Sequence, residues 1–594
     1  MKTGMRTHTN GELNDSNVRK RVTLCGWCHH RRDHGGVIFI DLRDRYGITQ
    51  VVFDPKFNKK SHSVGEKLRR EDCIQVEGVV KRRKKGMENK KLKTGGIEVF
   101  VEKLEVLNKS PTPPLEIDDR IVANEDVRLK YRYLDLRRPI MQRNLLLRHK
   151  ALQLTREFFS SQDFMEIETP ILLQPTPEGA RDYLVPSRVN PGRFYGLPQS
   201  PQMYKQLLMI AGYDRYFQIA RCFRDEDLRQ DRQPEFTQLD IEMSFVNQED
   251  IFEIMERWLQ HIFKKSLGKN IKIPFPRIPY KESMERYGID KPDLRFGLEL
   301  VDVTDAVKGS KFSVFNNVIK SKGIVKCVNP EHDFTRKELD AYADLAIKLG
   351  AKGMAWMKYE KGKLESNITK FFSEKDLKNL IKKTKIKKGA LFFIADKEEV
   401  VNNVLSSIRL DLGEKLELID KDKFEFCWIT EFPLFSKNEE TGEYEAEHHP
   451  FTGVVEEDIP KLGKDLGNIR SLSYDVVLNG VELGSGSIRI HDQELQQKIF
   501  KTLKLSEKDI KRRFGFFIDA LKFAVPHGGV APGFDRLIAL MLGYTDIREA
   551  IAFPKNKNAQ NPMDTSPGVV DEKQLKELHI KLDVVKNEDN KKPN

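Results

Sequence analysis

Several features are scarce or missing in this chain of 594 residues. Six cysteines occur, scattered at positions 25, 28, 73, 222, 327 and 427, which predicts a reducing, cytoplasmic setting without a disulfide framework. No run of about 18 apolar residues exists, so no membrane-spanning helix is expected. Residues 1–13 are polar and lack the apolar core of a secretory signal peptide. These absences argue against membrane proteins and small disulfide-stabilised secreted domains.

The first two cysteines invite a redox or zinc interpretation, which their surroundings argue against. Cys25-Gly26-Trp27-Cys28 lies within an alternating, strand-like run, and no second pair of Cys or His follows at zinc spacing. The composition, 39% hydrophobic and 32% charged, is that of a globular protein with several domains. The net charge of +12 suits a polyanionic partner. Much of the excess is lysine at 311–388 and after Lys573, where a solvated surface is the commoner explanation.

Short alternating runs broken by glycine dominate residues 20–107. Five strands are predicted, at 22–27, 37–42, 49–53, 74–80 and 97–107, with one helical pattern near 63–70. Five strands at this spacing are typical of a small β-barrel, and the five-stranded OB barrel commonly binds nucleic acid. Pro111-Thr112-Pro113-Pro114 then predicts a stiff connector.

A helical pattern follows from 140 to 163. Leu145, Leu152 and Phe159 recur every seven residues, and Pro139 suits a helix start. A strand that ends at Pro170 is predicted next. The helix either packs within its own subunit or contributes to an interface between two copies.

Two predicted strands, 216–223 and 236–245, flank a densely charged loop. A plain hairpin turn has about two to five residues rich in Gly and Asn. Arginine holds phosphate oxygens through a planar fork, and an aromatic ring can stack on a purine, so this loop is a candidate cradle for phosphate and adenine. A solvated loop with scattered ion pairs is the alternative.

Three segments carry a family resemblance. The charged loop from Phe223 to Phe236 resembles motif 2 of the class II aminoacyl-tRNA synthetases, and its sequence is similar to that of the bacterial aspartyl type. Residues 164–170 (FMEIETP) resemble motif 1, and residues 529–537 (GVAPGFDRL) resemble motif 3. The resemblance covers nearly the whole chain.

The resemblance implies an α+β multidomain protein. Its parts are an N-terminal OB-fold β-barrel, a class II synthetase catalytic domain built on an antiparallel sheet, and an α+β insertion domain of the bacterial type. The implied boundaries are 1–108 for the anticodon-binding barrel, 109–139 for a linker, 140–297 and 425–566 for the catalytic domain, 298–424 for the insertion and 567–594 for a C-terminal extension with a flexible tail.

The resemblance also implies an activity and its partners. The expected reaction is ATP-dependent attachment of L-aspartate to the tRNA for aspartate, and also to that for asparagine, through aspartyl-adenylate. Mg²⁺ with ATP and a homodimer formed by the helix and strand before Pro170 are implied. Arg224 and Arg536 match the catalytic arginines. The implied ATP-binding residues are Arg224, Asp225, Glu226, Gln233, Phe236, Glu482, Gly533, Phe534, Asp535 and Arg536.

The stretch 473–490 predicts two strands joined at Asn479-Gly480, a strong hairpin signal. This turn pairs residue 477 with 482, so Asp475 and Glu482 should project from one face as diagonal neighbours. Adjacent acids favour a cation between them, and the resemblance assigns both to Mg²⁺; an exposed acidic hairpin is the alternative. Strict alternation puts Arg489 on the opposite face, unless a bulge within 484–486 re-aims it.

An aspartate pocket needs cations for the negative side chain. Lys205 and Arg489 match the family residues that hold this carboxylate, whereas Glu178 and Asp240 suit the ammonium group. Asp240 shares one face of its strand with Glu242. His448 matches a mobile histidine that contacts aspartate. The whole implied set is Glu178, Ser200, Gln202, Met203, Tyr204, Lys205, Arg224, Asp240, His448 and Arg489.

Residues of the barrel match positions that read the tRNA. Phe39 and Gln50 match residues that stack on and hydrogen-bond anticodon bases, although a Phe on a strand usually belongs to the core. His34 and Gly86 resemble the bacterial enzymes that aspartylate the tRNAs for both aspartate and asparagine; a leucine and a lysine stand there in strict enzymes. The implied anticodon set is Arg32, Phe39, Gln50, Arg83 and Glu98.

Three alternatives stay open at this level. The chain could be a strictly discriminating aspartate enzyme, a related asparaginyl- or lysyl-tRNA synthetase, or a synthetase-like binding protein without catalysis. The Lys205 and Arg489 pair and the insertion favour the bacterial aspartyl type. The intact arginine and acid positions of the motifs argue against a binding protein.

Overall fold

The computed structural model describes residues 2–120, 123–175, 180–438 and 441–584. Glu178 and residues 585–594 of the tail predicted to be flexible lie outside the described residues. The chain forms two compact units, residues 1–149 with 548–569 and residues 150–547 with 570–594. In the described part of the chain, no helix is long and apolar enough to cross a membrane. All six cysteines lie in that part and are free thiols.

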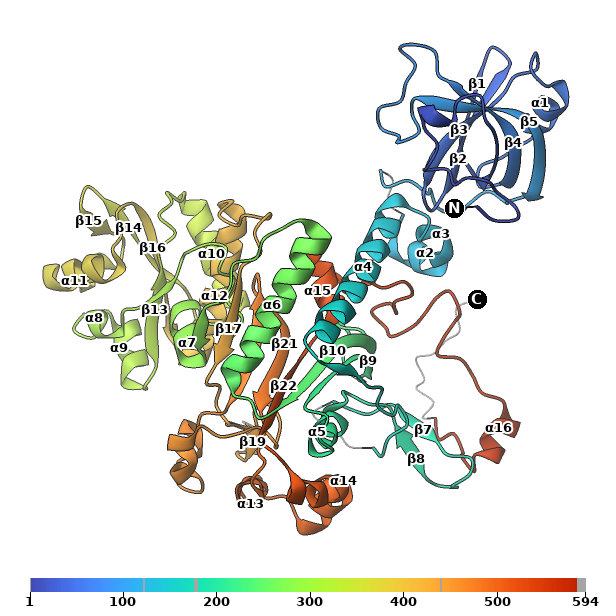
Figure 1. The fold of residues 1–594 in the computed structure, drawn as a ribbon. Coiled ribbons are helices and arrows are strands. Elements are labelled where there is room, and N and C mark those ends of the chain that lie inside the picture. Colours follow the sequence, from blue (N-terminus) through green and yellow to red (C-terminus); the bar gives the residue numbers. More distant parts are fainter. Residues whose placement is uncertain (1, 121–122, 176–179, 439–440, 585–594) are drawn as a thin grey trace. The chain divides into compact units, whose positions relative to one another are not determined.

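A closed five-stranded barrel forms much of the first unit (Figure 1). Its order is β1-β2-β3-β5-β4, with β1 (Arg21–His34), β2 (Val37–Asp44), β3 (Gly47–Phe53), β4 (Cys73–Arg82) and β5 (Ile97–Asn108). Alternate side chains such as Leu24, Ile40 and Val76 are fully buried inside it, because successive residues of a strand point to opposite faces. All five predicted strands are confirmed.

The predicted helix near 63–70 lies earlier in the chain than its pattern indicated. Helix α1 spans Lys59–Gly65, because Asn58 caps it by accepting a hydrogen bond from the Ser61 N–H at 2.9 Å. A 3₁₀ turn, η1 (Asp15–Asn17), precedes the barrel.

An arginine–carboxylate cluster organises the chain after the barrel. Two short helices, α2 (Glu125–Lys130) and α3 (Arg132–Asp135), lie within the segment predicted as a linker. Asp135 is fully buried and paired with Arg128 at 3.1 Å, Arg132 at 2.7 Å and Arg138 at 2.9 Å. Arg132 also donates to the carbonyl of Ile551 at 2.8 Å. The bond to Ile551, which follows η6 (Ile547–Ala550), joins two parts of the first unit that are far apart in sequence.

An eight-stranded, mainly antiparallel sheet is the centre of the second unit (Figure 1). The β6–β9 and β11–β17 pairs are parallel. Strand β10 pairs with β9 on one side and with β22 on the other, so residues near 220, 240 and 530 become neighbours. The strands, in spatial order, are β11 (Arg277–Pro279), β17 (Phe426–Thr430), β20 (Ser473–Leu478), β21 (Val481–Ile488), β22 (His527–Pro532), β10 (Glu235–Ser244), β9 (Arg215–Phe223) and β6 (Met165–Glu166).

Helices with apolar stripes pack on this sheet. Helix α4 (Pro139–Ser161) confirms the predicted helix, and α6 (Gln248–Leu267) buries Trp258, whose indole N–H donates to Thr155 at 3.1 Å. Asn247 caps α6, and Gly268, with φ of 69°, ends it. The second unit also contains α5 (Gln202–Ile210), α7 (Tyr280–Tyr287), α13 (Gln493–Thr502), α14 (Glu507–Ala520), α15 (Phe534–Met541), α16 (Glu572–Glu577), η3 (Glu456–Lys461), η4 (Leu466–Asn468), η5 (Leu521–Phe523) and the small strand pairs β7 (Leu184–Pro186) with β8 (Phe194–Gly196) and β18 (Phe435–Lys437) with β19 (Tyr444–Ala446).

A second sheet of the same unit is built from residues between 300 and 396. Its order is β12 (Leu300–Asp302), β13 (Ile324–Val328), β16 (Gly389–Asp396), β14 (Ala355–Glu360) and β15 (Lys363–Glu365). Helices α10 (Arg336–Lys348) and α12 (Glu398–Lys415) bury one face, and α8 (Thr304–Val307), α9 (Ser313–Lys320) and α11 (Glu374–Thr384) bury the other, with η2 (Thr369–Phe371) before α11. The predicted helix 336–349 and strand 390–395 are confirmed by α10 and β16.

Candidate active site

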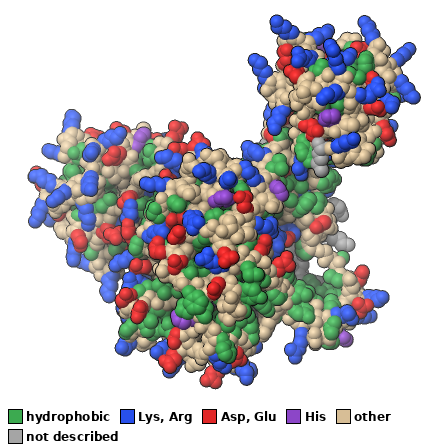
Figure 2. Space-filling view, viewed as in Figure 1, with side chains coloured by type: hydrophobic (Ala, Val, Ile, Leu, Met, Phe, Trp, Pro, Cys, Tyr) green, Lys and Arg blue, Asp and Glu red, His purple; other side chains and the backbone are tan. Residues whose placement is uncertain are grey.

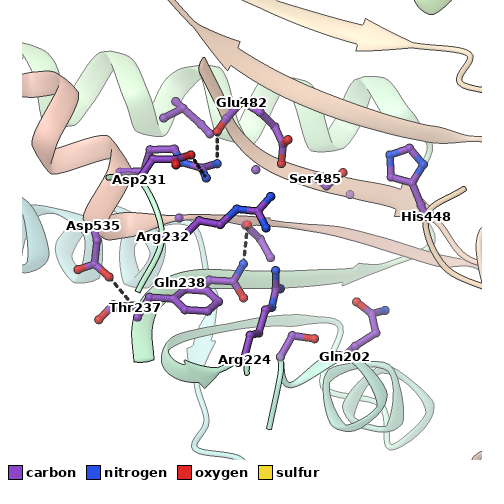
Figure 3. A pocket seen from close by; sticks show the side chains of 18 of the residues that line it. Gln202, Arg224, Asp231, Arg232, Thr237, Gln238, His448, Glu482, Ser485 and Asp535 are labelled. Atoms are coloured by element: carbon purple, nitrogen blue, oxygen red, sulfur yellow. Dashed lines mark hydrogen bonds and ion pairs between the residues drawn. The ribbon is translucent and has the colours of Figure 1, made fainter. Parts of the chain in front are cut away.

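A pocket of about 350 Å³ opens over the eight-stranded sheet (Figure 3). Its wall is built mainly from six places in the sequence: the start of α5, the loop after β9, strand β10, the segment 448–452, strand β21 with Arg489, and the start of α15. Strand pairing of β10 with β22 and of β22 with β21 brings several of these segments together over long sequence distances. The lining includes Ser200, Gln202, Arg224, Glu226, Asp231, Arg232, Gln233, Phe236, Thr237, Gln238, His448, His449, Thr452, Glu482, Ser485, Ser487, Arg489, Gly533, Asp535 and Arg536.

The β20–β21 hairpin forms as its turn sequence predicts. Asn479 and Gly480 have φ of 52° and 82°, the positive values that a two-residue type I′ turn requires. Val477 pairs with Glu482, which confirms the predicted register at the turn.

A bulge then changes which side chains of β21 face the pocket. Val476 pairs with Gly484, so Leu483 is an extra residue in the ladder. The bulge was predicted within 484–486 and lies one residue earlier, where the carbonyl of Leu483 accepts a hydrogen bond from the Gly533 N–H at 2.6 Å. Because the bulge reverses the alternation, Glu482 and Arg489 both line the pocket.

The two acids of this hairpin are electrostatically coupled. Burial and the negative charge of Asp475 raise the pKa of Glu482. Asp475 accepts a hydrogen bond from Ser485, and its carboxylate lies 3.6 Å from Nε2 of His448. Glu482 lines the pocket, whereas Asp475 lies behind Ser485. Across the described residues, no group of three or more His, Cys, Asp and Glu side chains is placed to hold a metal.

The charged loop between β9 and β10 places an arginine against an aromatic ring. The guanidinium carbon of Arg224 lies 5.0 Å from the centre of the Phe236 ring, and its Nε lies 3.4 Å from the carbonyl oxygen of Gln199. Farther along the loop, Arg232 pairs with Glu226 at 2.8 Å. The loop therefore presents a cation, a flat apolar surface and a carboxylate to one cavity.

The start of α15 is bonded to three neighbouring segments. Arg536 donates to the carbonyl of Glu482 at 2.5 Å and lies 3.2 Å from the carboxylate of Asp231. Asp535 accepts the Thr237 N–H at 2.7 Å. These contacts hold the helix start, the hairpin and the charged loop in one arrangement.

Four charged side chains form a buried network beside the pocket. Lys205 contacts Asp240 and lies 3.3 Å from Glu242, and Arg489 pairs with Glu242 at 2.9 Å. Burial favours the neutral acids, but Arg489 and Lys205 outweigh it at Glu242, whose pKa is lowered, whereas the pKa of Asp240 is raised. Arg489 lines the pocket, and the other three lie behind its wall.

Three buried polar atoms near the pocket have no hydrogen-bond partner among the residues that the structure describes. They are Oδ2 of Asp240, Nε2 of Gln202 and Oγ1 of Thr452, and the last two residues line the pocket. Buried polar atoms are nearly always paired in folded proteins. The atoms of Gln202 and Thr452 therefore indicate where a polar ligand would complete the site.

The two adjacent histidines have opposite electrostatic environments. Burial acts to lower the pKa of His448, but its contact with Asp475 outweighs burial and raises that pKa. Burial lowers the pKa of His449 to about 3, and the nearby charges of Arg489 and Lys205 act in the same direction. His449 is therefore neutral near pH 7.

The structure places the predicted ligand-binding residues in two groups. Twelve of them line the pocket: Ser200, Gln202, Arg224, Glu226, Gln233, Phe236, His448, Glu482, Arg489, Gly533, Asp535 and Arg536. The described residues that do not line it are Met203 and Phe534, which belong to apolar cores, Tyr204 beside Phe516, Asp225 beside Arg181, and the buried Lys205, Asp240 and Asp475. Their roles toward a ligand stay predictions.

Several lining residues were absent from the predicted set. Gln238 precedes Asp240 and Glu242 at alternate positions of β10, and Ser485 and Ser487 of β21 precede Arg489 at alternate positions. Strand alternation was the available signal for all of these. On β21, the alternation could be assigned to the pocket face only once the position of the bulge was known.

The barrel surface carries a second polar cluster. Arg32 donates to Asp41 at 2.9 Å and to Gln50 at 3.2 Å, and Gln50 donates to Glu98 at 2.8 Å. Burial raises the pKa of Glu98 and lowers that of Arg83. Hydrogen bonds and charge interactions therefore bring together four of the five predicted anticodon residues, namely Arg32, Gln50, Arg83 and Glu98.

The two predicted tRNA specificity positions lie in exposed loops of the barrel. The ring of His34 is exposed and lies 6.3 Å from that of Phe39, which is half-buried. Gly86 has φ of 87°, and no heavy atom of the described residues beyond its two chain neighbours lies within 4 Å of the place where a Cβ would be. Both positions are accessible to a macromolecular ligand.

Comparison with known proteins agrees with this arrangement. Residues 124–557 match the family described as class II tRNA synthetases (D, K and N), and residues 22–107 match the OB-fold nucleic acid binding domain. The chain is 52% identical over 583 residues to an aspartate–tRNA(Asp/Asn) ligase of Caldanaerobacter subterraneus subsp. tengcongensis, covering 98% of both chains. It is 50% identical to the enzyme of the same name from Aquifex aeolicus, covering 97% of this chain and 98% of that one.

Solved structures share the fold. The asparaginyl-tRNA synthetase of Pyrococcus horikoshii with asparaginyl-adenylate superposes with a TM-score of 0.58 at 20% identity, covering 91% of this chain and 96% of that chain. The fold, the sequence motifs and the extent of the family match agree with one another. The chain therefore belongs to the class II tRNA synthetases of the aspartate, lysine and asparagine group.

Proposed function

We propose that this chain attaches L-aspartate to tRNA in an ATP-dependent reaction that passes through aspartyl-adenylate. The observation that carries the proposal is the position of Arg489 in the pocket wall, on the same cavity as Arg224 and Phe236. One part of the cavity suits a negatively charged amino acid, and the other suits a nucleotide. The near-full-length similarity to ligases named for aspartate and tRNA supports this assignment.

In the first step, an oxygen of the aspartate α-carboxylate bonds to the α-phosphorus of ATP while the bond to pyrophosphate breaks. Catalysis of such a transfer is mainly positioning and neutralisation of charge. Arg224 is placed to neutralise the α-phosphate, and its neighbour Phe236 offers a ring for adenine stacking. Arg536, at the start of α15, supplies a second cation. In the second step, a ribose hydroxyl of the tRNA's terminal adenosine attacks the acyl carbon, and AMP leaves.

Recognition of aspartate rests on the buried network. Arg489 faces the cavity and is the cation for the substrate's side-chain carboxylate. Asp240 is our candidate for the substrate ammonium group: its Oδ2 is a buried acceptor without a hydrogen-bond partner among the described residues, just behind the side chains that line the pocket. Lys205 lies behind both, where its charge keeps Asp240 and Glu242 together. Glu178, the other candidate for the ammonium group, lies outside the described residues.

The residues present fit a magnesium ion that accompanies ATP. Asp475 and Glu482 are close enough for one to raise the pKa of the other, so a cation near them would relieve the repulsion. Carboxylate oxygens are ligands that Mg²⁺ prefers, and the ion usually shares its coordination with phosphates and water. When bound, such an ion would neutralise phosphate charge. Glu482 would hold it directly, and Asp475, bonded to Ser485, would complete the acidic pair.

The tRNA side of the proposal concerns the barrel. Phe39, Gln50 and the polar cluster around Arg32 form a half-buried surface suited to unstacked bases. At the edge of this surface, the imidazole of His34 can donate or accept a hydrogen bond, and Gly86 has no side chain that could exclude a base. Both features support acceptance of the tRNAs for aspartate and asparagine. Many of the similar proteins carry names that include both tRNAs. A cytoplasmic homodimer is part of the same proposal.

An exchange assay between ATP and pyrophosphate tests the assignment. With aspartate, the purified protein should exchange label rapidly without tRNA; with asparagine or lysine it should not. Exchange driven best by asparagine or lysine would instead assign the chain to a sister activity of its family. No exchange with any of the three would support a binding protein.

A further inference from the structure

The second sheet of the unit carries a surface with an unusual charge. Between residues 361 and 388, ten lysines stand against three acidic residues. All ten are exposed. We call them the lysine surface; they are Lys361, Lys363, Lys370, Lys375, Lys378, Lys382, Lys383, Lys385, Lys387 and Lys388. Figure 2 shows blue side chains along the edge of the molecule that carries β15 and α11 in Figure 1.

Helix α11 arranges part of this surface in a line. Leu377, Leu380 and Ile381 pack inward against the core that covers one face of the sheet. Lys375, Lys378 and Lys382 are spaced three and four residues apart and so share the outer face of the helix. At 1.5 Å of rise per residue, this spacing gives one positive charge about every 5 Å.

The protein itself does little to neutralise these charges. Of the ion pairs between described residues, none involves a member of the lysine surface, although exposed lysines elsewhere, such as Lys415 and Lys504, are paired at 2.9 Å. Like charges on adjacent helical turns repel one another. A polyanion supplied from outside would remove that repulsion.

The surroundings favour a nucleic acid over a lipid surface. Within 361–388, no large hydrophobic side chain is among the exposed ones of the described residues, whereas membrane-surface helices present an apolar face. The neighbouring strand β14 adds Trp356, with the guanidinium carbon of Arg336 5.2 Å from its ring, in an open groove that is also lined by Lys358, Thr369 and two acids, Glu360 and Glu365. Basic side chains with an aromatic ring are typical of RNA-binding surfaces.

We propose that the lysine surface binds the phosphate backbone of the tRNA substrate, as a contact separate from the anticodon-binding barrel. The inference rests on the proposed function, because it takes tRNA as the polyanion. The contact is electrostatic and reads no bases, so it strengthens binding of cognate and non-cognate tRNA alike.

The test uses the full chain and a variant in which Lys375, Lys378, Lys382 and Lys383 are all replaced by glutamine, which keeps helix propensity. The dissociation constant for tRNA transcripts specific for aspartate and for an unrelated amino acid is measured across a salt series. We expect the variant to bind both at least about tenfold more weakly at low salt, and the slope of log affinity against log salt to fall by about 3–4, near 0.7–0.9 for each of four lost phosphate contacts.

A matched variant controls for loss of exposed lysine in general. It replaces Lys264, Lys265, Lys272 and Lys281, which are exposed, outside the lysine surface, and include two in the last turn of α6; it should bind tRNA like the wild type. Thermal melting confirms that both variants fold.

Two outcomes would overturn the proposal. The first is that the lysine-surface variant and the control variant bind tRNA with the same affinity and the same dependence on salt. The other is loss of binding to phosphatidylserine vesicles in the lysine-surface variant while tRNA binding stays intact, which would assign the surface to lipid. Exchange of ATP and pyrophosphate with aspartate needs no tRNA, so it should be unchanged in both variants; its failure in the wild type would count against the proposed function instead.

Discussion

At the scale of single residues, the site depends on charges removed from water. Glu242 is fully buried and bonded to Arg489, and Lys205 lies against Glu242 and Asp240. Breaking a buried pair by removing one partner costs about 3–5 kcal/mol, because the remaining charge stays buried without compensation. Substitutions that keep the charge are therefore more informative than those that delete it.

Arg489→Lys should weaken aspartate activation while leaving ATP binding nearly unchanged. Lysine keeps the charge but cannot reproduce the two bonds from the guanidinium to Glu242, at 2.9 and 3.2 Å. We expect the KM for aspartate in exchange to rise about a hundredfold, or about 2.7 kcal/mol. Arg470→Lys, at an arginine paired with Asp458 outside the pocket, is the control. A change in KM within about threefold would reject the assignment of Arg489.

Glu482→Gln should change the magnesium dependence of exchange. The substitution removes the negative charge that burial and Asp475 already oppose, so the folded protein should be no less stable. We expect a higher Mg²⁺ concentration for half-maximal exchange and unaltered tRNA binding, measured by titration of both. An unchanged magnesium curve would argue that the hairpin acids do not serve ATP.

His34→Leu with Gly86→Lys should sharpen the choice between the tRNAs for aspartate and asparagine. An imidazole both donates and accepts hydrogen bonds, and a glycine leaves room, so the present pair tolerates two bases. We expect comparable charging of both tRNAs by the wild type and a preference for the aspartate tRNA in the variant, measured as kcat/KM.

Lysine at position 86 must adopt a positive φ, which carries a modest strain. His34→Leu alone is free of that strain and serves as the control. A wild-type preference above about a hundredfold, or 2.7 kcal/mol, would contradict relaxed specificity.

At the scale of elements, the pocket depends on how closely β10, β22 and β21 approach one another. Gly529 of β22 lies so near β10 that an added Cβ would be 2.1 Å from the Glu242 carboxylate and 2.1 Å from the carbonyl of Ile241. The strands can pair in this register because the residue has no side chain.

Gly529→Ala should disrupt both stability and activation. The methyl group would force Glu242 away from Arg489 or push the strands apart, and overpacking of this kind costs about 1–3 kcal/mol. We expect a lower melting temperature and a loss of aspartate-dependent exchange. Gly515→Ala, within α14 and with its nearest atom 3.7 Å from the added Cβ, should be neutral or stabilising. Wild-type exchange in Gly529→Ala would show that the close approach is dispensable.

At the scale of the whole molecule, exposed apolar side chains cluster in sequence after α4. Met165, Ile171 and Leu172 are each about half exposed, at 51%, 49% and 53%. This segment includes motif 1, and large apolar side chains grouped on a surface are typical of protein interfaces. We therefore expect a homodimer in solution.

Sedimentation at micromolar concentration should report the mass of a dimer, and Ile171→Glu with Leu172→Glu should shift it toward the monomer. Val189 is 76% exposed in the loop between β7 and β8. The control substitution Val189→Glu should leave the dimer intact. A wild-type monomer under these conditions would refute the prediction.

Local patterns in the sequence were sufficient for the barrel strands, α4, α10, the strands around the charged loop and the Asn479-Gly480 turn. Each of these depends on periodicity or on turn chemistry within a few residues. The start of α1 was missed, although its signal was local, because Asn58 caps the helix before its apolar pattern begins.

Only the tertiary structure decided the details of the pocket. The place of the bulge depends on Gly533, 50 residues from Leu483, and the burial of Lys205 depends on strand β10. The sequence by itself determined the element types, the family and the residue types available for chemistry, because these follow from short-range pattern and motif. Long-range strand pairing determined which of those residues share one cavity, because a single extra residue in a strand reverses every side chain that follows it.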